Sequence, residues 1–225
     1  MKNFPAICVD NFYDDPDSVR SLALAQNYTN TEEGRYPGKR SEPLYQIKPK
    51  MFDQFCERLF SIYYDFGKST DVSWRIETSF QLIEPYSSNK DSYKNVGWIH
   101  QDVATVFAGI IYLNPSADPS CGTSIYQLKL DSKYDHVQDK RKELYDSGID
   151  DGYDEALKKH NDCFVETARF NNVYNRLVSF DGDSYHAANN FLTGNEPRLT
   201  QVFFVYEMYT TSLTPLDRMR KYNVG

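Results

Sequence analysis

The stretch that most constrains the fold runs from Trp98 to Leu113 and reads WIHQDVATVFAGIIYL. From Val103 onward it is rich in β-branched and aromatic residues, which is typical of a buried central strand. His100 and Asp102 precede that run two positions apart, so on an extended segment both side chains point to the same face. A charged pair at the mouth of a buried strand is costly unless something offsets the charge. The stretch therefore predicts a polar site at one end of a β-sheet core.

A metal ion would offset this charge, and a third ligand is available further along the chain. His186 lies in the apolar setting NRLVSFDGDSYHAANNF. Two histidines and one carboxylate that leave coordination positions open form the facial triad of non-haem Fe(II) oxygenases. The residues therefore indicate a metal site formed by His100, Asp102 and His186.

The chain has four histidines, and a lone histidine is more often structural than a metal ligand. His160 also begins an H-x-D pattern, but it follows two lysines in a charged segment, so we expect it on an exposed helix. His136 is flanked by polar residues, and we expect it at the surface. Sequence context thus favours His100 and His186.

A second polar pair follows in the run PRLTQVFF. Arg198 and Thr200 are two apart on a predicted strand and should point the same way. Guanidinium and hydroxyl together suit a carboxylate. An arginine on an edge strand is the simpler reading, but Leu199, Val202 and Phe204 indicate an interior strand, where a buried arginine needs an anionic partner. That partner is expected to be a ligand.

Length and composition agree with a large β domain. The chain has 225 residues, and tyrosine and phenylalanine are abundant. The formal charge of −7 argues against general nucleic-acid binding. Without a bilayer-spanning stretch or a signal pattern, we expect no membrane association and a cytoplasmic location. The four cysteines show no C-x-x-C spacing, which indicates neither a disulfide framework nor a zinc ribbon.

Periodicity and breaker residues place the elements in order. Helices are predicted from Asp15 as N-cap with Pro16 first, then over 50–66, 137–145, 153–159 and 214–222. Strands are predicted over 4–12, 72–82, 103–113, 124–130, 164–174, 176–180, 184–188 and 199–208. This pattern predicts a mainly β protein with flanking α-helices, a double-sheet jelly roll of the cupin type. We expect one domain over 1–225, with helical support in 1–70, the core in 72–208 and a tail from 213.

Two further segments are candidates for substrate contact. The loop GRYPGKRS contributes Tyr36, Lys39 and Arg40, and the charged excursion over 131–161 lies between predicted strands. Each segment is either a solvated excursion or a part of the site, the excursion then being a lid.

The order of these motifs resembles the Fe(II)/2-oxoglutarate-dependent dioxygenases, above all the prolyl-4-hydroxylase-like branch and its uncharacterised bacterial and phage relatives. The resemblance rests on H-x-D at 100–102, Tyr-Leu-Asn-Pro at 112–115, Gly-Thr-Ser at 122–124, the distal His186 and Arg-x-Thr at 198–200. It covers residues 74–208. Cys121 stands where relatives often have the first glycine of Gly-Gly-Thr.

The resemblance implies a double-stranded β-helix with Fe(II) held by His100, Asp102 and His186. The distal carboxylate of 2-oxoglutarate would then pair with Arg198, helped by Thr200 and Tyr112. With O2 as the second cosubstrate, the products would include succinate and CO2. A carboxylate at the position where related halogenases have a small residue favours hydroxylation.

The implied substrate is a peptidyl or amino-acid side chain, or a small molecule, and the location is the host cytoplasm if the chain is phage-encoded. Two other classes stay open: a cupin-like metalloenzyme of another reaction type, and a non-catalytic binding module on the same fold. Strict dependence on 2-oxoglutarate would separate the first from an oxygenase, and failure to retain iron would favour the second.

Overall fold

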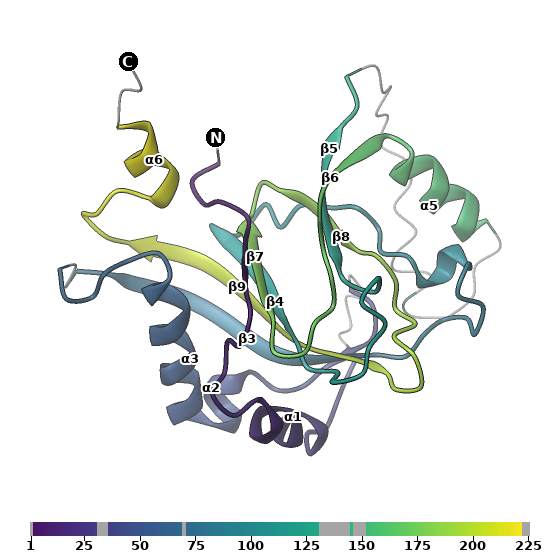
Figure 1. Ribbon diagram of the computed structural model, residues 1–225, viewed down its shortest axis with the longest axis horizontal. Coiled ribbons are helices and arrows are strands. Elements are labelled where there is room, and N and C mark those ends of the chain that lie inside the picture. The colour runs from purple at the N-terminus through teal and green to yellow at the C-terminus, as the bar shows by residue number, and fades with distance from the viewer. Residues whose placement is uncertain (1, 31–35, 69–70, 131–144, 146–151, 222–225) are drawn as a thin grey trace.

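The protein is built on two antiparallel β-sheets, seen in Figure 1. The computed structural model describes residues 2–30, 36–68, 71–130, 145 and 152–221. The strands are β1 (Ile7–Val9), β2 (Lys39–Arg40), β3 (Ser73–Ile83), β4 (Phe107–Tyr112), β5 (Thr123–Leu128), β6 (Phe164–Phe170), β7 (Leu177–Asp181), β8 (Tyr185–Ala188) and β9 (Arg198–Tyr209). The large sheet has the order β1-β7-β4-β9-β3-β2, and the small sheet has the order β6-β5-β8.

From β3 onward the chain winds between the two sheets. It passes from β4 in the large sheet to β5 and β6 in the small one, then to β7, β8 and β9 in alternation. Between β3 and β4, His100 pairs with His186, so the segment before β4 adds an edge to the small sheet beside β8. This alternation is the double-stranded β-helix, and the predicted mainly β jelly roll is confirmed.

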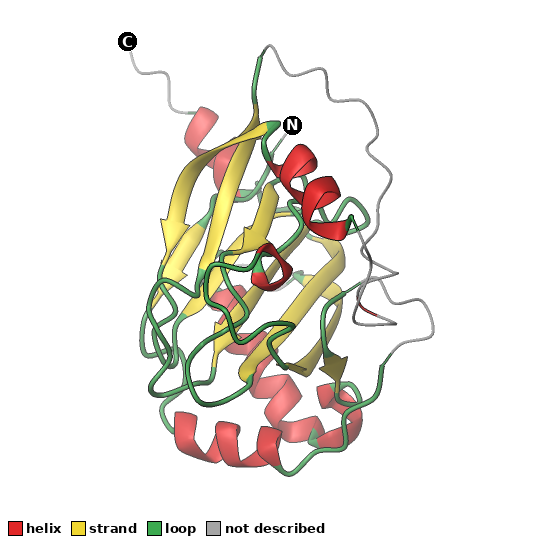
Figure 2. Ribbon diagram, turned by 90° about the vertical axis from the view of Figure 1, so that its right-hand side faces the viewer, coloured by secondary structure: helices red, strands yellow, loops and turns green. Residues whose placement is uncertain are grey.

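Three helices cover the outer face of the large sheet and enclose the main core. They are α1 (Pro16–Leu24), α2 (Leu44–Ile47) and α3 (Pro49–Ser61), which gather at the foot of the molecule in Figure 2. On α3, Phe55 and Phe60 are fully buried, and their rings contact Phe203 of β9 and Phe107 of β4. Burial of each such ring contributes on the order of 2–3 kcal/mol.

The opposite face of the large sheet lies toward the small sheet. Alternation along β3 predicts one apolar and one polar face, yet Ser79 and Gln81 on the polar face are buried. Gln81 lines an internal cavity, and its side-chain amide donates to the carbonyl of Pro37 at 2.7 Å. The polar residues of that face therefore lie in the interior, where the candidate site is found.

Most predicted elements are confirmed with shifted ends. The N-cap at Asp15 is present, since its carboxylate accepts the amide hydrogen of Ser18. The central strand begins at Phe107 and not at Val103, which lies in a turn and is 74% exposed. The first third also contributes β1 and β2, which lie at the two edges of the large sheet.

The prediction of an exposed helix around His160 is wrong. The helix α5 (Tyr153–Asn161) lies beside the small sheet (Figure 1). His160 is 4% exposed. Tyr153, Leu157 and His160 share one helix face, which contacts Trp98. The lysines before His160 lie on the other face, so local charge does not report the burial of this histidine. The helix predicted over 137–145 falls outside the described residues except for its last position.

The C-terminal part contains α6 (Pro215–Arg220), within the predicted tail helix. Its N-cap is Thr214, whose hydroxyl accepts the amide hydrogen of Asp217. A short 3-10 helix, η1 (Tyr93–Asn95), lies in the loop before β4. Among the helices that the structure describes, none combines the length and the apolar character needed to cross a membrane.

Candidate metal centre and its cavity

The three predicted ligands meet at one point between the sheets. One ligand atom from each of His100, Asp102 and His186 lies within 4.8 Å of the others. The Nε2 atom of His100 is 3.8 Å from Oδ1 of Asp102, and Nε2 of His186 is 3.5 Å from Oδ2. Within the described residues this is the group of nitrogen, sulfur and carboxylate donors whose geometry suits a metal ion.

Backbone pairing explains why residues so distant in sequence come together. The amide of His100 donates to the carbonyl of His186 at 3.1 Å, and the reverse bond is 2.9 Å. Gly97 donates to Ala188 in the same ladder, and a Cβ at Gly97 would lie 2.7 Å from that carbonyl oxygen. The ladder therefore requires glycine at this position for its close approach. Asp102 donates to Gly182 at 3.1 Å, which anchors the third ligand.

Both histidines are oriented by backbone carbonyls. The Nδ1 atom of His100 is 2.7 Å from the carbonyl oxygen of Trp98, and Nδ1 of His186 is 3.0 Å from that of Ser184. A carbonyl only accepts, so Nδ1 carries a proton in each ring, and Nε2 is the ring nitrogen that points toward the carboxylate of Asp102. This is the arrangement in which histidine binds a metal. Two such nitrogens and one carboxylate fit Fe(II) as a facial triad.

The three side chains border a cavity of about 510 Å³. His186 and Asp102 are mostly buried, with side-chain exposures of 10% and 17%, while that of His100 is 35%. The apolar part of the cavity wall includes the aromatic side chains of Trp98, Phe180, Phe191, Phe204 and Tyr206. Its polar lining includes Arg40, Gln81, Thr105, Thr123, Arg198 and Thr200. A cavity of this size and lining is typical of a small-molecule site.

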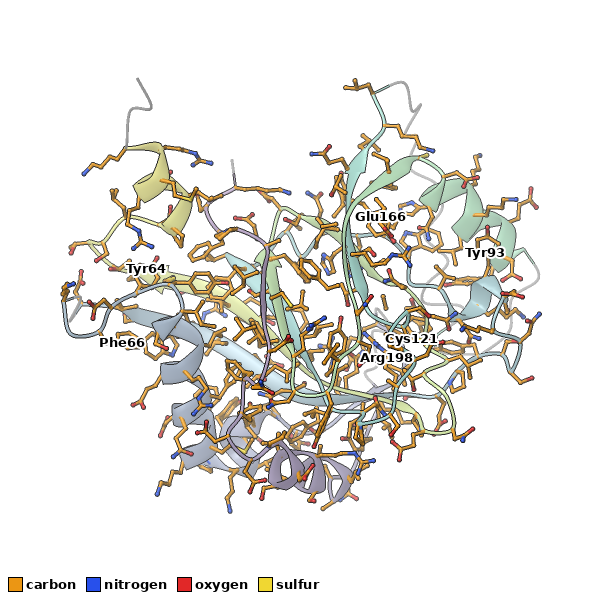
Figure 3. The ribbon with its side chains drawn as sticks, in the orientation of Figure 1. Tyr64, Phe66, Tyr93, Cys121, Glu166 and Arg198 are labelled. Atoms are coloured by element: carbon orange, nitrogen blue, oxygen red, sulfur yellow. The ribbon has the colours of Figure 1, made fainter. Side chains whose placement is uncertain are left out.

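Arg198 is a buried cation on this cavity wall. It is 3% exposed, and its Nη1 donates to the carbonyl of Cys121 at 2.6 Å; Figure 3 labels both residues. Burial lowers the pKa of Arg198, and the neighbouring Tyr112 partly opposes that shift. Across the residues that the structure describes, no carboxylate forms an ion pair with it. A buried guanidinium without an anionic partner is costly, which indicates that an anion binds here.

The two other predicted cofactor residues occupy different positions. Thr200 is 2% exposed and lines the cavity beside Arg198. Tyr112 is fully buried and is not among the lining residues. Its hydroxyl donates to Thr123 at 3.0 Å, and its ring centroid is 5.3 Å from the Arg198 guanidinium. Tyr112 therefore supports Arg198 and Thr123 from behind the wall, and burial raises its pKa.

Of the three predicted substrate residues, two reach the cavity. The guanidinium of Arg40 lies 3.6 Å above the ring of Tyr36, and both residues line the wall. Lys39 is exposed and is not a lining residue. The alternation of side chains along β2 explains the difference, because neighbouring residues point to opposite faces.

Sequence reasoning missed Thr123 and two residues of α5. Thr123 lines the cavity within the Gly-Thr turn, a motif that was visible but to which no role was assigned. His160 donates from Nε2 to the carbonyl of Ile99 at 2.7 Å, and the Asn161 amide accepts from Ile99 and donates to Gly97. The sequence signal for His160 is its spacing from Tyr153 and Leu157, because residues at these positions share one face of a helix.

The fold is that of solved structures of low sequence identity. EvdO2 from Micromonospora carbonacea var. aurantiaca matches with a TM-score of 0.54 at 12% identity, over 95% of this chain and 91% of its own. HygX from Streptomyces hygroscopicus, with nickel and 2-oxoglutarate bound, matches with a TM-score of 0.53 at 12% identity, over 92% and 85%. The resemblance to the Fe(II)/2-oxoglutarate dioxygenases is thus confirmed at the level of fold.

Sequence comparisons complete the assignment. The curated proteins contain no match to this chain. A family model, described as a family of unknown function, DUF6445, matches residues 1–192. Since the match covers most of the 225 residues, the chain belongs to the DUF6445 family.

Proposed function

We propose that the protein is an Fe(II)- and 2-oxoglutarate-dependent dioxygenase that hydroxylates a C–H bond. The observation that carries the proposal is the convergence of two Nδ1-protonated histidines and one carboxylate in a cavity that also holds Arg198, a buried cation with no ion-pair partner among the described residues. His100, Asp102 and His186 would hold the iron. When bound, iron with 2-oxoglutarate and O2 supplies the oxidising power, and 2-oxoglutarate leaves as succinate and CO2.

The remaining polar residues of the wall have roles in binding. Arg198 would form a bidentate pair with the distal carboxylate of 2-oxoglutarate, and the hydroxyls of Thr200 and Thr123 lie on the same wall. Tyr112 fixes the Thr123 hydroxyl through its own hydrogen bond. The structures of EvdO2 and HygX with 2-oxoglutarate support a 2-oxoglutarate site in this fold.

The substrate in this proposal is a peptidyl or amino-acid side chain or a small molecule. The aromatic side chains of the wall give the substrate an apolar surface. HygX has been solved with nickel, 2-oxoglutarate and hygromycin B, so this fold accommodates a small molecule next to a metal and 2-oxoglutarate. The presence of Asp102 favours hydroxylation, because in the related halogenases a small residue in that position leaves room for a halide ligand.

The first experiment is an anaerobic titration of the purified protein with Fe(II) and 2-oxoglutarate. We expect a visible metal-to-ligand charge-transfer band in the native protein. His100→Ala should abolish it by removing a ligand, and Arg198→Ala should weaken 2-oxoglutarate binding by about tenfold or more through loss of a charged hydrogen-bond pair. Lys39→Ala, outside the cavity, is the control. A folded native protein that gives no band, or a band that His100→Ala leaves intact, contradicts the proposal.

A second readout separates the oxygenase from the other metalloenzymes that share this fold. In air, the iron-loaded protein should convert 2-oxoglutarate slowly to succinate even without substrate. Asp102→Ala should reduce succinate formation to background. Succinate formation that continues undiminished in Asp102→Ala would refute the assignment of this carboxylate as a ligand.

A further inference from the structure

Arg40 brings a second guanidinium into the cavity. It lies on β2, whose backbone is fixed by pairing with Gln81 of β3 on one side and with Thr29 on the other. The guanidinium carbon is 3.6 Å from the centroid of the Tyr36 ring and 5.0 Å from that of Phe204. Stacking uses the flat face of the guanidinium and leaves its N–H edge for a hydrogen-bonding partner.

The charge of Arg40 is not matched by an ion pair in the described part of the chain. Its Nε atom is buried and has no hydrogen-bond partner there. Burial lowers the pKa of Arg40, while Tyr36, Asp102 and Glu77 act in the opposite direction from a distance. Asp102 is one of the proposed iron ligands, so the metal ion would balance its negative charge. A planar group with several N–H donors therefore faces the cavity with unused bonding capacity.

The two cavity arginines lie in different surroundings. Arg198 stands against Tyr112 and the Cys121 carbonyl, whereas Arg40 stands against Tyr36 and Phe204. In the proposed function, one carboxylate of 2-oxoglutarate goes to Arg198 and its keto-acid end goes to the metal. That cosubstrate leaves Arg40 without an anion. The second guanidinium is thus available to the substrate.

We propose that Arg40 binds an oxyanion of the substrate, a carboxylate or a phosphate, and that the substrate is therefore an anionic molecule. This inference rests on the proposed function, because it assigns the other anion site to 2-oxoglutarate. The fork of the guanidinium matches both oxyanions in a bidentate manner. The rings of Tyr36 and Phe204 lie beside the bound oxyanion and offer an apolar surface to the rest of the molecule. Arg40 lines the same cavity as His100, Asp102 and His186, so the anchored group lies in the cavity that the candidate metal site borders.

The test measures binding of simple probes by 19F NMR. The probes are 4-fluorophenylacetate, 4-fluorobenzylphosphonate and the neutral 4-fluorophenylacetamide, each titrated into full-length protein loaded with Zn(II) and saturating 2-oxoglutarate. A charge-assisted pair predicts that at least one anion binds about tenfold or more tighter than the amide. In Arg40→Gln this preference should disappear. Lys39→Gln removes the same charge from the neighbouring, exposed residue and should keep the preference.

Several results would overturn the proposal. The native protein could bind the anions no better than the amide, or Arg40→Gln could retain the preference. Loss of the preference in Arg198→Gln alone would place the probe at the 2-oxoglutarate site. Thermal unfolding checks that Arg40→Gln is folded. Arg40→Lys is the second variant, since it keeps the charge, loses the planar fork and should reduce the preference several-fold.

The same samples separate this inference from the proposed function. Binding of 2-oxoglutarate is measured by calorimetry in each variant, and Arg40→Gln should leave it unchanged. If the native protein fails to bind 2-oxoglutarate, the proposed function fails, and the probe titration without 2-oxoglutarate still reports on Arg40. If 2-oxoglutarate binds but no anion prefers the native protein over Arg40→Gln, only the assignment of Arg40 fails.

Discussion

Arg198 is held in place by neutral groups. It is 3% exposed, a backbone carbonyl accepts one of its hydrogen bonds, and an aromatic ring lies beside it. Such neutral groups do not offset the free-energy cost of removing a positive charge from water. The cost is understandable at a binding site, where a ligand supplies the anion and the empty protein carries the penalty.

This cost can be measured with Arg198→Met, which keeps volume and removes the charge. We expect the free energy of unfolding of the ligand-free protein to stay unchanged or to rise by up to about 2 kcal/mol, because relief from burying the charge outweighs the lost bond to Cys121. Arg176→Met is the control, since Arg176 is paired with Asp10, and should lose up to about 1 kcal/mol. Urea unfolding measures both. A loss above about 1 kcal/mol in Arg198→Met would mean that the residue is structural.

The sequence pattern singled out residues whose proposed role follows from their spacing along the chain. It misjudged residues whose role depends on how deeply the fold buries them. His100 and Asp102 were found because their spacing fixes a common face. Tyr112 was suggested only by the resemblance to the dioxygenases, and it shares a face of β4 with Ala108 and Ile110, which line the cavity. Periodicity predicts which face of a strand a residue occupies, but not whether its side chain reaches the cavity. It therefore could not show that the Tyr112 hydroxyl donates to Thr123, which lies between Tyr112 and the cavity.

At the scale of elements, α5 holds the segment that carries His100. His160 and Asn161 make three hydrogen bonds to the backbone of Gly97 and Ile99. The helix belongs to the excursion that sequence reasoning left equally as a lid or a solvated loop. Its C-terminal end instead bonds to the backbone of the segment that carries His100, one residue of the candidate metal site.

We therefore predict that His160→Phe weakens metal binding. Phenylalanine keeps the ring against Trp98 and removes the hydrogen bond to Ile99, so the position of His100 is less well defined. By analogy with outer-shell partners of metal ligands, the loss of affinity should be about tenfold. Anaerobic Co(II) titration measures it, and Lys159→Ala on the exposed face of α5 is the control. Unchanged affinity in a folded His160→Phe protein would exclude a positioning role.

The turn before β5 supports Arg198 through the carbonyl of Cys121, and Asp118 stabilises this turn. Lys90 pairs with Asp118, and Ser120 donates two hydrogen bonds to it, so the pKa of Asp118 falls to about 2. Because the pKa of Asp118 is lower in the folded protein than in the unfolded chain, its ionisation stabilises the fold at pH values above the unfolded-state pKa. This stabilisation is lost as the pH falls toward about 2.

The corresponding variant is Asp118→Asn. Near neutral pH it should be less stable by about 1 kcal/mol, a value reduced for the partial exposure of the pair. The difference from the native protein should persist down to about pH 4 and shrink below it. Urea unfolding at about pH 6 and about pH 3 measures the change, and Asp91→Asn, an exposed neighbour, should show none. A difference that grows on acidification contradicts the assignment.

Elements with strong periodicity could be predicted, and those created by tertiary contacts could not. β3 and β9 could be predicted because they are long: eleven and twelve consecutive residues of β-forming character are a strong strand signal. β2 has two residues in a stretch rich in glycine and proline. It forms because the edge of β3 offers partners at Gln81 and Leu82, which a local pattern does not contain.

At the scale of the whole molecule, both sheets contribute to the site. His186 comes from the small sheet and Arg198 from the large one, so metal and 2-oxoglutarate together would connect the two layers. A ligand that binds the native state and not the unfolded chain stabilises the fold by mass action. The proposed site therefore has a consequence for global unfolding that does not require a known substrate.

With metal and 2-oxoglutarate at about 100 times their dissociation constants, each should add about 2.7 kcal/mol, and each should raise the Tm of a chain of this size by about 5–10 °C. Because 2-oxoglutarate chelates the metal, its contribution should depend on metal being present. Asp102→Ala should lose both increments, and Asp53→Ala, on the exposed face of α3, should keep both. Differential scanning calorimetry under nitrogen measures the shifts. Equal increases in Tm with and without metal would contradict the proposed site, because binding there includes a bond from 2-oxoglutarate to the metal.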